Sequence, residues 1–151
     1  MTVSRIVASA AVAMAAFTIV GAPSASAAVL TTQFRLAGTT LCLDGSTGGA
    51  IADVRLATCG LGDRQLWRWS TPGGDTSLRH VGTGACAHRV RTEVGLSTCG
   101  TAVSQRWKVT GTPDAMVIKA ADTGQCLGRT AAARVGMSPC NGGAAQHWQR
   151  G

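Results

Sequence analysis

The sequence predicts an all-β domain built from three copies of one strand-rich unit. A Gln-x-Trp tripeptide recurs about 40 residues apart, each time with five residues between it and a preceding cysteine, namely Cys59, Cys99 and Cys140. Short runs of alternating apolar and polar residues fill each copy. Alternation is typical of strands, and a repeat of this length indicates a supersecondary unit that buries its apolar face against its neighbours. Many short, regularly spaced strands favour a barrel or sandwich, with about four strands per unit and about twelve in all.

Residues 1–27 have the organisation of a secretory signal peptide. Arg5 supplies a positive charge, Ile6 to Val20 is an apolar run rich in Ala, and Ala25-Ser26-Ala27 is a small-residue cleavage site. The pattern predicts cleavage after Ala27 and a secreted, extracellular protein. An uncleaved membrane anchor is the alternative, but the run is short for a bilayer span. No later segment is apolar enough to span, so we expect no membrane association after cleavage.

The first unit is expected over about residues 31–70. Its strands are indicated by the alternating runs Thr32–Leu36, Val54–Leu56 and Trp67–Trp69. The cluster Thr71–Asp75 contains Pro and two Gly residues, which favour a turn after the last strand. The first unit therefore ends where this turn begins.

The second and third units are expected over about residues 76–110 and 115–150. Trp107–Val109 indicates the last strand of the second unit, and Val117–Ala120 indicates an early strand of the third. The turn cluster Gly111–Asp114 separates them. No stretch after the signal peptide shows the apolar spacing of a helix. Because the connections are short, the units form one domain, residues 28–151.

The repeated Gln-x-Trp positions predict a shared core. Trp is a large core filler, and three copies in register can meet on one axis. The Gln lies two residues before the Trp and therefore on the same face of the strand. A buried amide there must be hydrogen-bonded, most simply by backbone groups of its own repeat. We favour these structural roles over ligand contact for the six residues concerned: Gln65, Trp67, Gln105, Trp107, Gln146 and Trp148.

Each unit carries two of the six cysteines, which decides among the fifteen possible pairings. In a secreted chain the cysteines are expected as disulfides within repeats: Cys42–Cys59, Cys86–Cys99 and Cys126–Cys140. Each bridge closes a loop of about 15 residues, which is worth about 3 kcal/mol in the chain-entropy model. No C-x-x-C pair occurs, and the three histidines are not spaced as zinc ligands, so no metal is expected.

Charge and motifs exclude several functions. The formal net charge is +7, but the basic residues are scattered and there is no Tyr, so the basic, aromatic surface of a nucleic-acid-binding protein is absent. A solubilising surface is the favoured interpretation, and an anionic partner is the alternative. No catalytic motif of a serine hydrolase, zinc protease or phosphate-binding enzyme occurs. We expect a protein without enzymatic activity and without a cofactor.

The cysteine pair followed by Gln-x-Trp, present three times, resembles the ricin B-type lectin family. The resemblance covers the whole chain after the signal peptide. It implies a β-trefoil, in which three four-stranded units surround a pseudo-threefold axis, six strands form a short barrel and six form hairpin caps. It also implies carbohydrate binding.

The family's usual sugar site has three elements in each repeat: an Asp two residues after the first cysteine, an aromatic two residues before the second, and an Asn before the Gln. The first repeat keeps the Asp as Asp44, whereas the others have His88 and Gly128. The aromatic position holds Ala57, Ser97 and Ser138. The Asn position holds Arg64, Ser104 and Ala145. The resemblance therefore implies at best one weak sugar site, in the first repeat.

Asp44 and Arg55 are the candidate sugar-binding residues. Arg55 stands where the family often has a polar group, and its guanidinium can bind an anionic group. Asp44 before Gly45 could instead stabilise a turn, and the two side chains could form an ion pair. Trp69 could offer a stacking surface, but a core position is favoured. The ligand would be a galactose-like or anionic glycan. The alternative is a β-trefoil that has lost sugar binding and contacts a protein partner, as an inhibitor or surface factor.

Overall fold

The computed structural model describes residues 27–46, 53–71 and 74–151. The predicted signal peptide, apart from Ala27, lies outside these residues. Within them, no helix is long and apolar enough to cross a membrane.

Twelve strands run through the described chain, four from each repeat. The first repeat supplies β1 (Ala28–Leu36), β2 (Leu41–Ser46), β3 (Asp53–Thr58) and β4 (Leu66–Thr71). The second supplies β5 (Arg79–His80), β6 (Cys86–Val90), β7 (Glu93–Ser97) and β8 (Trp107–Thr112). The third supplies β9 (Ala115–Ala120), β10 (Cys126–Ala131), β11 (Arg134–Ser138) and β12 (Trp148–Arg150). The strands predicted from alternating residues lie in β1, β3, β4, β8 and β9, and the all-β fold class is confirmed.

Six of the strands form a closed barrel. β1 pairs with both β4 and β12, β12 pairs with β9, and β9 pairs with β8. β4 also pairs with β5. An isolated bridge between Thr76, which precedes β5, and Trp107, the first residue of β8, closes the ring. All of these pairings are antiparallel, and closure leaves no unpaired barrel edge.

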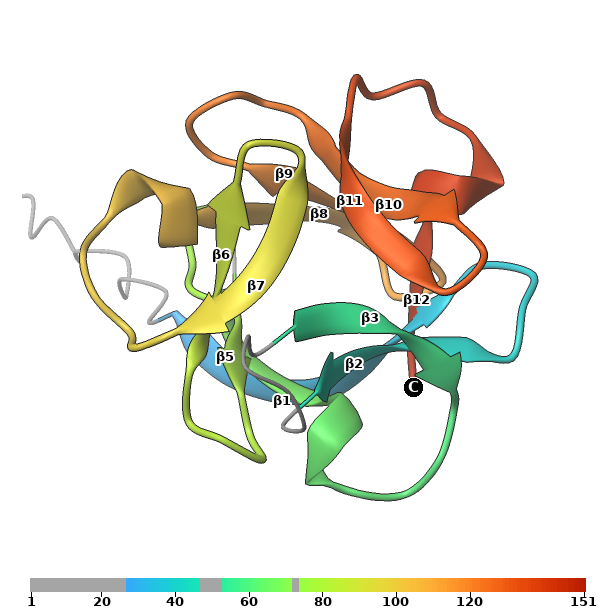
Figure 1. Ribbon diagram of the computed structural model, residues 1–151, viewed down its shortest axis with the longest axis horizontal. Helices are drawn as coiled ribbons and strands as arrows, with labels where there is room; N and C mark the ends of the chain where they lie inside the picture. The colour runs from blue at the N-terminus through green and yellow to red at the C-terminus, as the bar shows by residue number, and fades with distance from the viewer. Residues whose placement is uncertain (1–26, 47–52, 72–73) are drawn as a thin grey trace, which may run out of the picture.

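The other six strands form three hairpins: β2–β3, β6–β7 and β10–β11. Figure 1 shows these hairpins arranged around a common centre, one from each repeat. Neighbouring hairpins touch through β3–β7 and β11–β3 pairings. This barrel with three hairpin caps is the arrangement that the resemblance implies.

The core is built from equivalent positions of the three repeats. Trp67, Trp107 and Trp148 are fully buried, as the repeat predicts. Three further equivalent residues, eight positions before the first cysteine of each repeat, are also fully buried: Phe34, Leu78 and Ile118. A buried Trp removes more apolar surface from water than other residues, so the three indoles account for much of the core energy.

Three short 3-10 helices were not predicted: η1 (Asp63–Gln65), η2 (Val103–Gln105) and η3 (Ala144–Gln146). Each ends at the Gln of a Gln-x-Trp tripeptide. A single turn has no apolar period, so residue spacing cannot reveal it. Its effect is to aim the Gln side chain back into its own repeat.

The six cysteines pair within repeats, as predicted: Cys42–Cys59, Cys86–Cys99 and Cys126–Cys140. Each bridge joins the first strand of a hairpin cap to the segment that follows its second strand. Three disulfides indicate a protein that matures in an oxidising environment.

Candidate functional site

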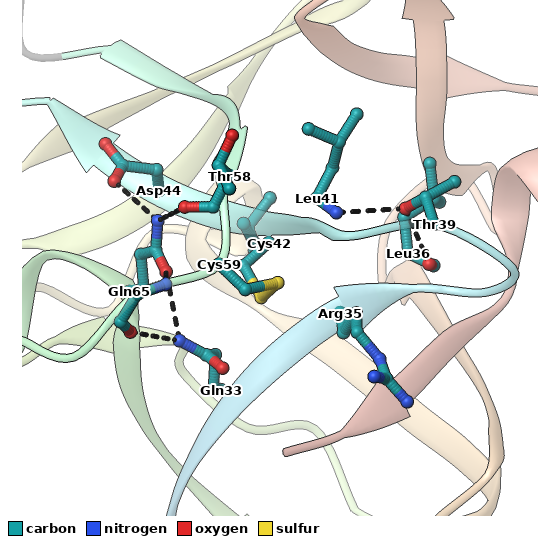
Figure 2. The surroundings of a disulfide bond; sticks show 12 residues. Gln33, Arg35, Leu36, Thr39, Leu41, Cys42, Asp44, Thr58, Cys59 and Gln65 are labelled. Atoms are coloured by element: carbon teal, nitrogen blue, oxygen red, sulfur yellow. Dashed lines mark hydrogen bonds between the residues drawn. A yellow bond between two sulfur atoms is a disulfide. The ribbon is translucent and has the colours of Figure 1, made fainter.

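The candidate site of the first repeat is organised by Gln65. Its Oε1 accepts hydrogen bonds from the backbone N–H of Gly60 at 2.9 Å and from Nε2 of Gln33 at 3.0 Å. Its Nε2 donates to the carbonyl of Thr58 at 3.0 Å and to Oδ2 of Asp44 at 3.2 Å. Figure 2 shows this amide between β2, the end of β3 and β1, close to the Cys42–Cys59 bridge. All of the hydrogen-bonding capacity of the Gln65 amide is therefore used to fix the loop that carries it.

The Trp of each tripeptide is fixed in the same way. The indole Nε1 donates to the carbonyl of the residue after the first cysteine, at 3.0–3.1 Å in all three repeats: Leu43, Ala87 and Leu127. The predicted structural role of the Gln-x-Trp residues is thus supported by their partners, which lie within their own repeats. The tripeptide joins the hairpin cap to the barrel.

Asp44 lies in β2, inside the hairpin, and its side chain is only 4% exposed. Its interpretation as a turn residue is therefore wrong. Oδ1 accepts a hydrogen bond from Nη2 of Arg64 at 3.0 Å, and Oδ2 accepts the one from Gln65. Both carboxylate oxygens already have protein partners, and burial of a charge requires such partners.

Arg55 and Arg64 flank this carboxylate. Nε of Arg55 lies 3.8 Å from Oδ1 of Asp44, so the ion pair considered from the sequence is present, but with a buried carboxylate. Arg55 lies directly opposite Asp44 in the β2–β3 hairpin, and Arg64 lies in η1. Their side chains are 47% and 53% exposed. Two guanidiniums share one carboxylate, so the outer face of the site carries a formal excess of one positive charge.

In repeats two and three, the amide of the tripeptide Gln has a different side-chain partner. There the Gln Nε2 donates to a serine hydroxyl at 2.8 Å, Ser97 in one repeat and Ser138 in the other. These serines stand at the family's aromatic position, where the first repeat has Ala57 without a hydroxyl. Asp44 in the first repeat thus accepts the hydrogen bond that serine accepts elsewhere. This complementary pattern is present in the sequence: Asp44 occurs with Ala57, whereas the two repeats without the Asp have a serine at the position of Ala57.

His88 and Gly128 replace the Asp in these two repeats. Nδ1 of His88 is buried and has no hydrogen-bond partner among the described residues. A Cβ on Gly128 would lie 2.5 Å from the carbonyl oxygen of Ala145 and 2.8 Å from Cγ of Gln146. No side chain fits at position 128 without displacement of the third repeat's loop, so a carboxylate cannot simply be restored there.

Trp69 does not form a stacking surface. Its side chain is buried, and its ring lies 6.0 Å from that of Phe34, centroid to centroid. The favoured core position is therefore confirmed. Consequently, no Trp of the described chain lies exposed beside Asp44.

One ion pair joins the second and third repeats. Arg89 of β6 binds both carboxylate oxygens of Asp122, which follows β9. The hydrogen bond from Arg89 lowers the pKa of Asp122 from its ordinary value of 3.8. This bidentate geometry is the strong form of such a pair.

Comparisons with known proteins agree with this architecture. Residues 30–148 match the family model described as the ricin-type beta-trefoil lectin domain. No curated protein matches the chain.

Several solved structures are similar. The designed 3-fold symmetric protein ThreeFoil is 20% identical with a TM-score of 0.71, over 80% of this chain and 96% of that chain. The hemolytic lectin CEL-III is 19% identical with a TM-score of 0.68, over 79% of this chain and 29% of that chain. The Haemophilus ducreyi cytolethal distending toxin is 17% identical with a TM-score of 0.67, over 80% of this chain and 81% of that chain. These likenesses show the fold, and the predicted β-trefoil is confirmed.

Proposed function

Because the chain belongs to the ricin-type β-trefoil lectin domain family, we propose that it is a secreted, non-catalytic carbohydrate-binding module. Its single weak sugar site lies in the first repeat and comprises Asp44, Arg55 and Arg64. The observation that carries this assignment is the pair of half-exposed guanidiniums on one buried carboxylate. Asp44 holds the two arginines, and the arginines contact the ligand.

The chemistry of the outer face favours an acidic glycan over a neutral galactoside. A neutral sugar is bound most strongly when its hydroxyls donate to a free carboxylate, but both oxygens of Asp44 are engaged by Arg64 and Gln65. The groups left facing solvent are donors. A uronate or sulfate group accepts from guanidinium with charge assistance, whereas a hydroxyl oxygen accepts without it.

The site is expected to be weak. Ala57 stands where an aromatic ring would cover the apolar face of the sugar, and Trp69 is buried in the core. Binding must then come from a few solvent-exposed charged hydrogen bonds, each weakened by water. We expect a Kd of about 1 mM, equivalent to about −4 kcal/mol.

A glycan array at two salt concentrations tests the proposal. Acidic glycans should bind in low salt and lose binding at high salt, because exposed charges are screened. Arg64→Gln should weaken the interaction at least about fivefold, since it removes one of the two exposed cations. Arg68→Gln, which changes an exposed arginine of β4, is the matched control and should bind as the unaltered protein does. Salt-insensitive binding of neutral galactosides, unchanged by Arg64→Gln, would refute the acidic-glycan assignment.

Protein–protein contact without sugar binding is the second candidate. It is favoured by the burial of Asp44 and by the loss of the family's aromatic in every repeat. A folded protein that binds no glycan at either salt concentration would support this candidate and exclude the first.

A further inference from the structure

A second candidate site lies where the three hairpin caps meet. A cavity of about 470 Å³ opens there, lined by residues of β3, β6, β7, β10 and β11. Val54, Val94 and Val135 contribute to its lining, one from each repeat at equivalent positions, and all three are buried. Its lining residues therefore place the cavity between the three hairpins, and the three buried valines give it an apolar floor.

The rim of this cavity carries charges that break the threefold repeat. The residue before each valine is Asp53, Glu93 or Arg134, so equivalent positions hold two carboxylates and one guanidinium. Arg55, one residue after Val54, adds a second guanidinium. The four formal charges sum to zero.

Positive and negative charges occupy different sides of the rim. Arg55 and Arg134 lie directly opposite each other where β3 pairs with β11. Asp53 lies opposite Gly95 of β7, the strand that begins with Glu93. The guanidiniums thus gather at the β3–β11 contact and the carboxylates at the β3–β7 contact.

These rim charges lack close partners. Within the described ranges, no ion pair of 4.0 Å or less involves Asp53, Glu93 or Arg134. Arg55 has only the 3.8 Å contact with Asp44, whose nearer cation is Arg64. Like charges directly opposite each other on adjacent strands destabilise a sheet, and a bound anionic group between them would relieve the repulsion.

We propose that this cavity binds a small zwitterion. A carboxylate or phosphodiester group would accept from Arg55 and Arg134, while an ammonium group would face Asp53 and Glu93. The apolar floor would take the intervening methylene or methyl groups. A ligand of one sign would leave two rim charges uncompensated, whereas a zwitterion of zero net charge matches both sides. This site is separate from the proposed sugar site, although Arg55 borders both.

Titration with sn-glycero-3-phosphocholine, followed by amide chemical shifts of the purified protein, tests the inference. This probe has both charges and no net charge. Binding at about millimolar Kd should shift amides of β3, β7 and β11. Choline and glycerol 3-phosphate, which each keep one charged group, should bind at least about fivefold more weakly. Equal affinity for either of these probes would overturn the proposal, as would shifts at the same amides caused by methyl galactoside.

Two exposed residues allow a charge-by-charge test. Arg134→Gln and Glu93→Gln should each weaken glycerophosphocholine binding at least about fivefold, with thermal midpoints no lower than that of the unaltered protein. Arg68→Gln, which changes an exposed arginine of β4 outside both proposed sites, should leave this affinity unchanged. The sugar site is tested separately by Arg64→Gln in the glycan array, so failure of one proposal is distinguishable from failure of the other. If the zwitterion does not bind, or if both rim variants bind it normally, the inference is wrong.

Phosphatidylcholine vesicles identify the source of the ligand. Cosedimentation that is lost in Arg134→Gln and Glu93→Gln would assign the site to a lipid headgroup. Binding of the soluble probe without cosedimentation would assign it to a free small molecule.

Discussion

Replacement of Asp44 by Asn tests whether this residue stabilises the hairpin cap. The carboxylate accepts from Gln65 through one oxygen and from Arg64 through the other. An amide of the same shape has one acceptor oxygen, so its NH2 group must face a donor in either orientation. A hydrogen bond to a charged group contributes about 1.5–3 kcal/mol, and Gln65 keeps its second acceptor on Thr58. We expect the free energy of unfolding to fall by about 2 kcal/mol.

The corresponding shift in melting temperature is large enough to measure. A domain of about 120 residues has an unfolding entropy of about 0.25 kcal/mol/K, so 2 kcal/mol corresponds to about 8 °C. Calorimetry of Asp44→Asn and of Asp114→Asn, which makes the same change in the exposed β8–β9 turn, provides the comparison. The control should change stability by less than about 0.5 kcal/mol. Equal melting temperatures for the two variants would show that Asp44 is not held by Gln65 and Arg64, and the geometric argument would fail.

Three further changes test other parts of the fold. Trp107→Ala should lower the free energy of unfolding by about 3–5 kcal/mol, because the indole is fully buried; an unchanged chemical-denaturation midpoint would contradict this. Gly128→Ala should cost about 1–3 kcal/mol, since its Cβ would lie 2.5 Å from a carbonyl oxygen, whereas Gly60→Ala meets no described atom within 4 Å and should cost much less in the same assay. Asp122→Asn should lower stability at pH 7 by at most about 1 kcal/mol. Because Arg89 lowers the pKa of Asp122, that stabilisation is present above pH 3.8 and is lost as pH falls below it, so thermal melts of the two proteins should converge in acid.

The fold could be predicted because its determinants are repeated. A single alternating run such as Thr32–Leu36 is ambiguous, but three copies in register remove the ambiguity. The disulfides followed from the same repetition. Barrel closure could not be derived from spacing, because the β1–β12 pairing joins opposite ends of the chain through backbone hydrogen bonds. The 3-10 turn that ends at the Gln of each tripeptide could not be predicted either, since three residues define no period.

The role of the site residues was harder to predict, because the partners of a carboxylate depend on its burial, which the sequence alone does not give. The sequence offered an ion pair between Asp44 and Arg55 as one alternative, and the structure brings Nε of Arg55 to 3.8 Å from Oδ1 of Asp44. It did not reveal that Arg64 would reach the same carboxylate, or that the side chain would be almost fully enclosed. Nor did it indicate that Arg55 and Arg134, about 80 residues apart, would lie opposite each other. Contacts of this kind depend on which hairpin caps pair with each other in the folded protein.

The three repeats differ in the side chain that accepts a hydrogen bond from the tripeptide Gln, and this difference explains why only the first repeat has an Asp two residues after its first cysteine. The tripeptide Gln needs one side-chain acceptor besides a backbone carbonyl, and the acceptor is Asp44 in one repeat but Ser97 or Ser138 in the others. A repeat with the serine does not need an Asp to satisfy its Gln, and the Asp position holds His88 in one such repeat and Gly128 in the other. In the first repeat Ala57 offers no hydroxyl, and Asp44 must remain whether or not a sugar binds. The presence of Asp44 is therefore accounted for by its hydrogen bonds to Gln65 and Arg64, and evidence for sugar binding must come from binding assays on the half-exposed side chains of Arg55 and Arg64.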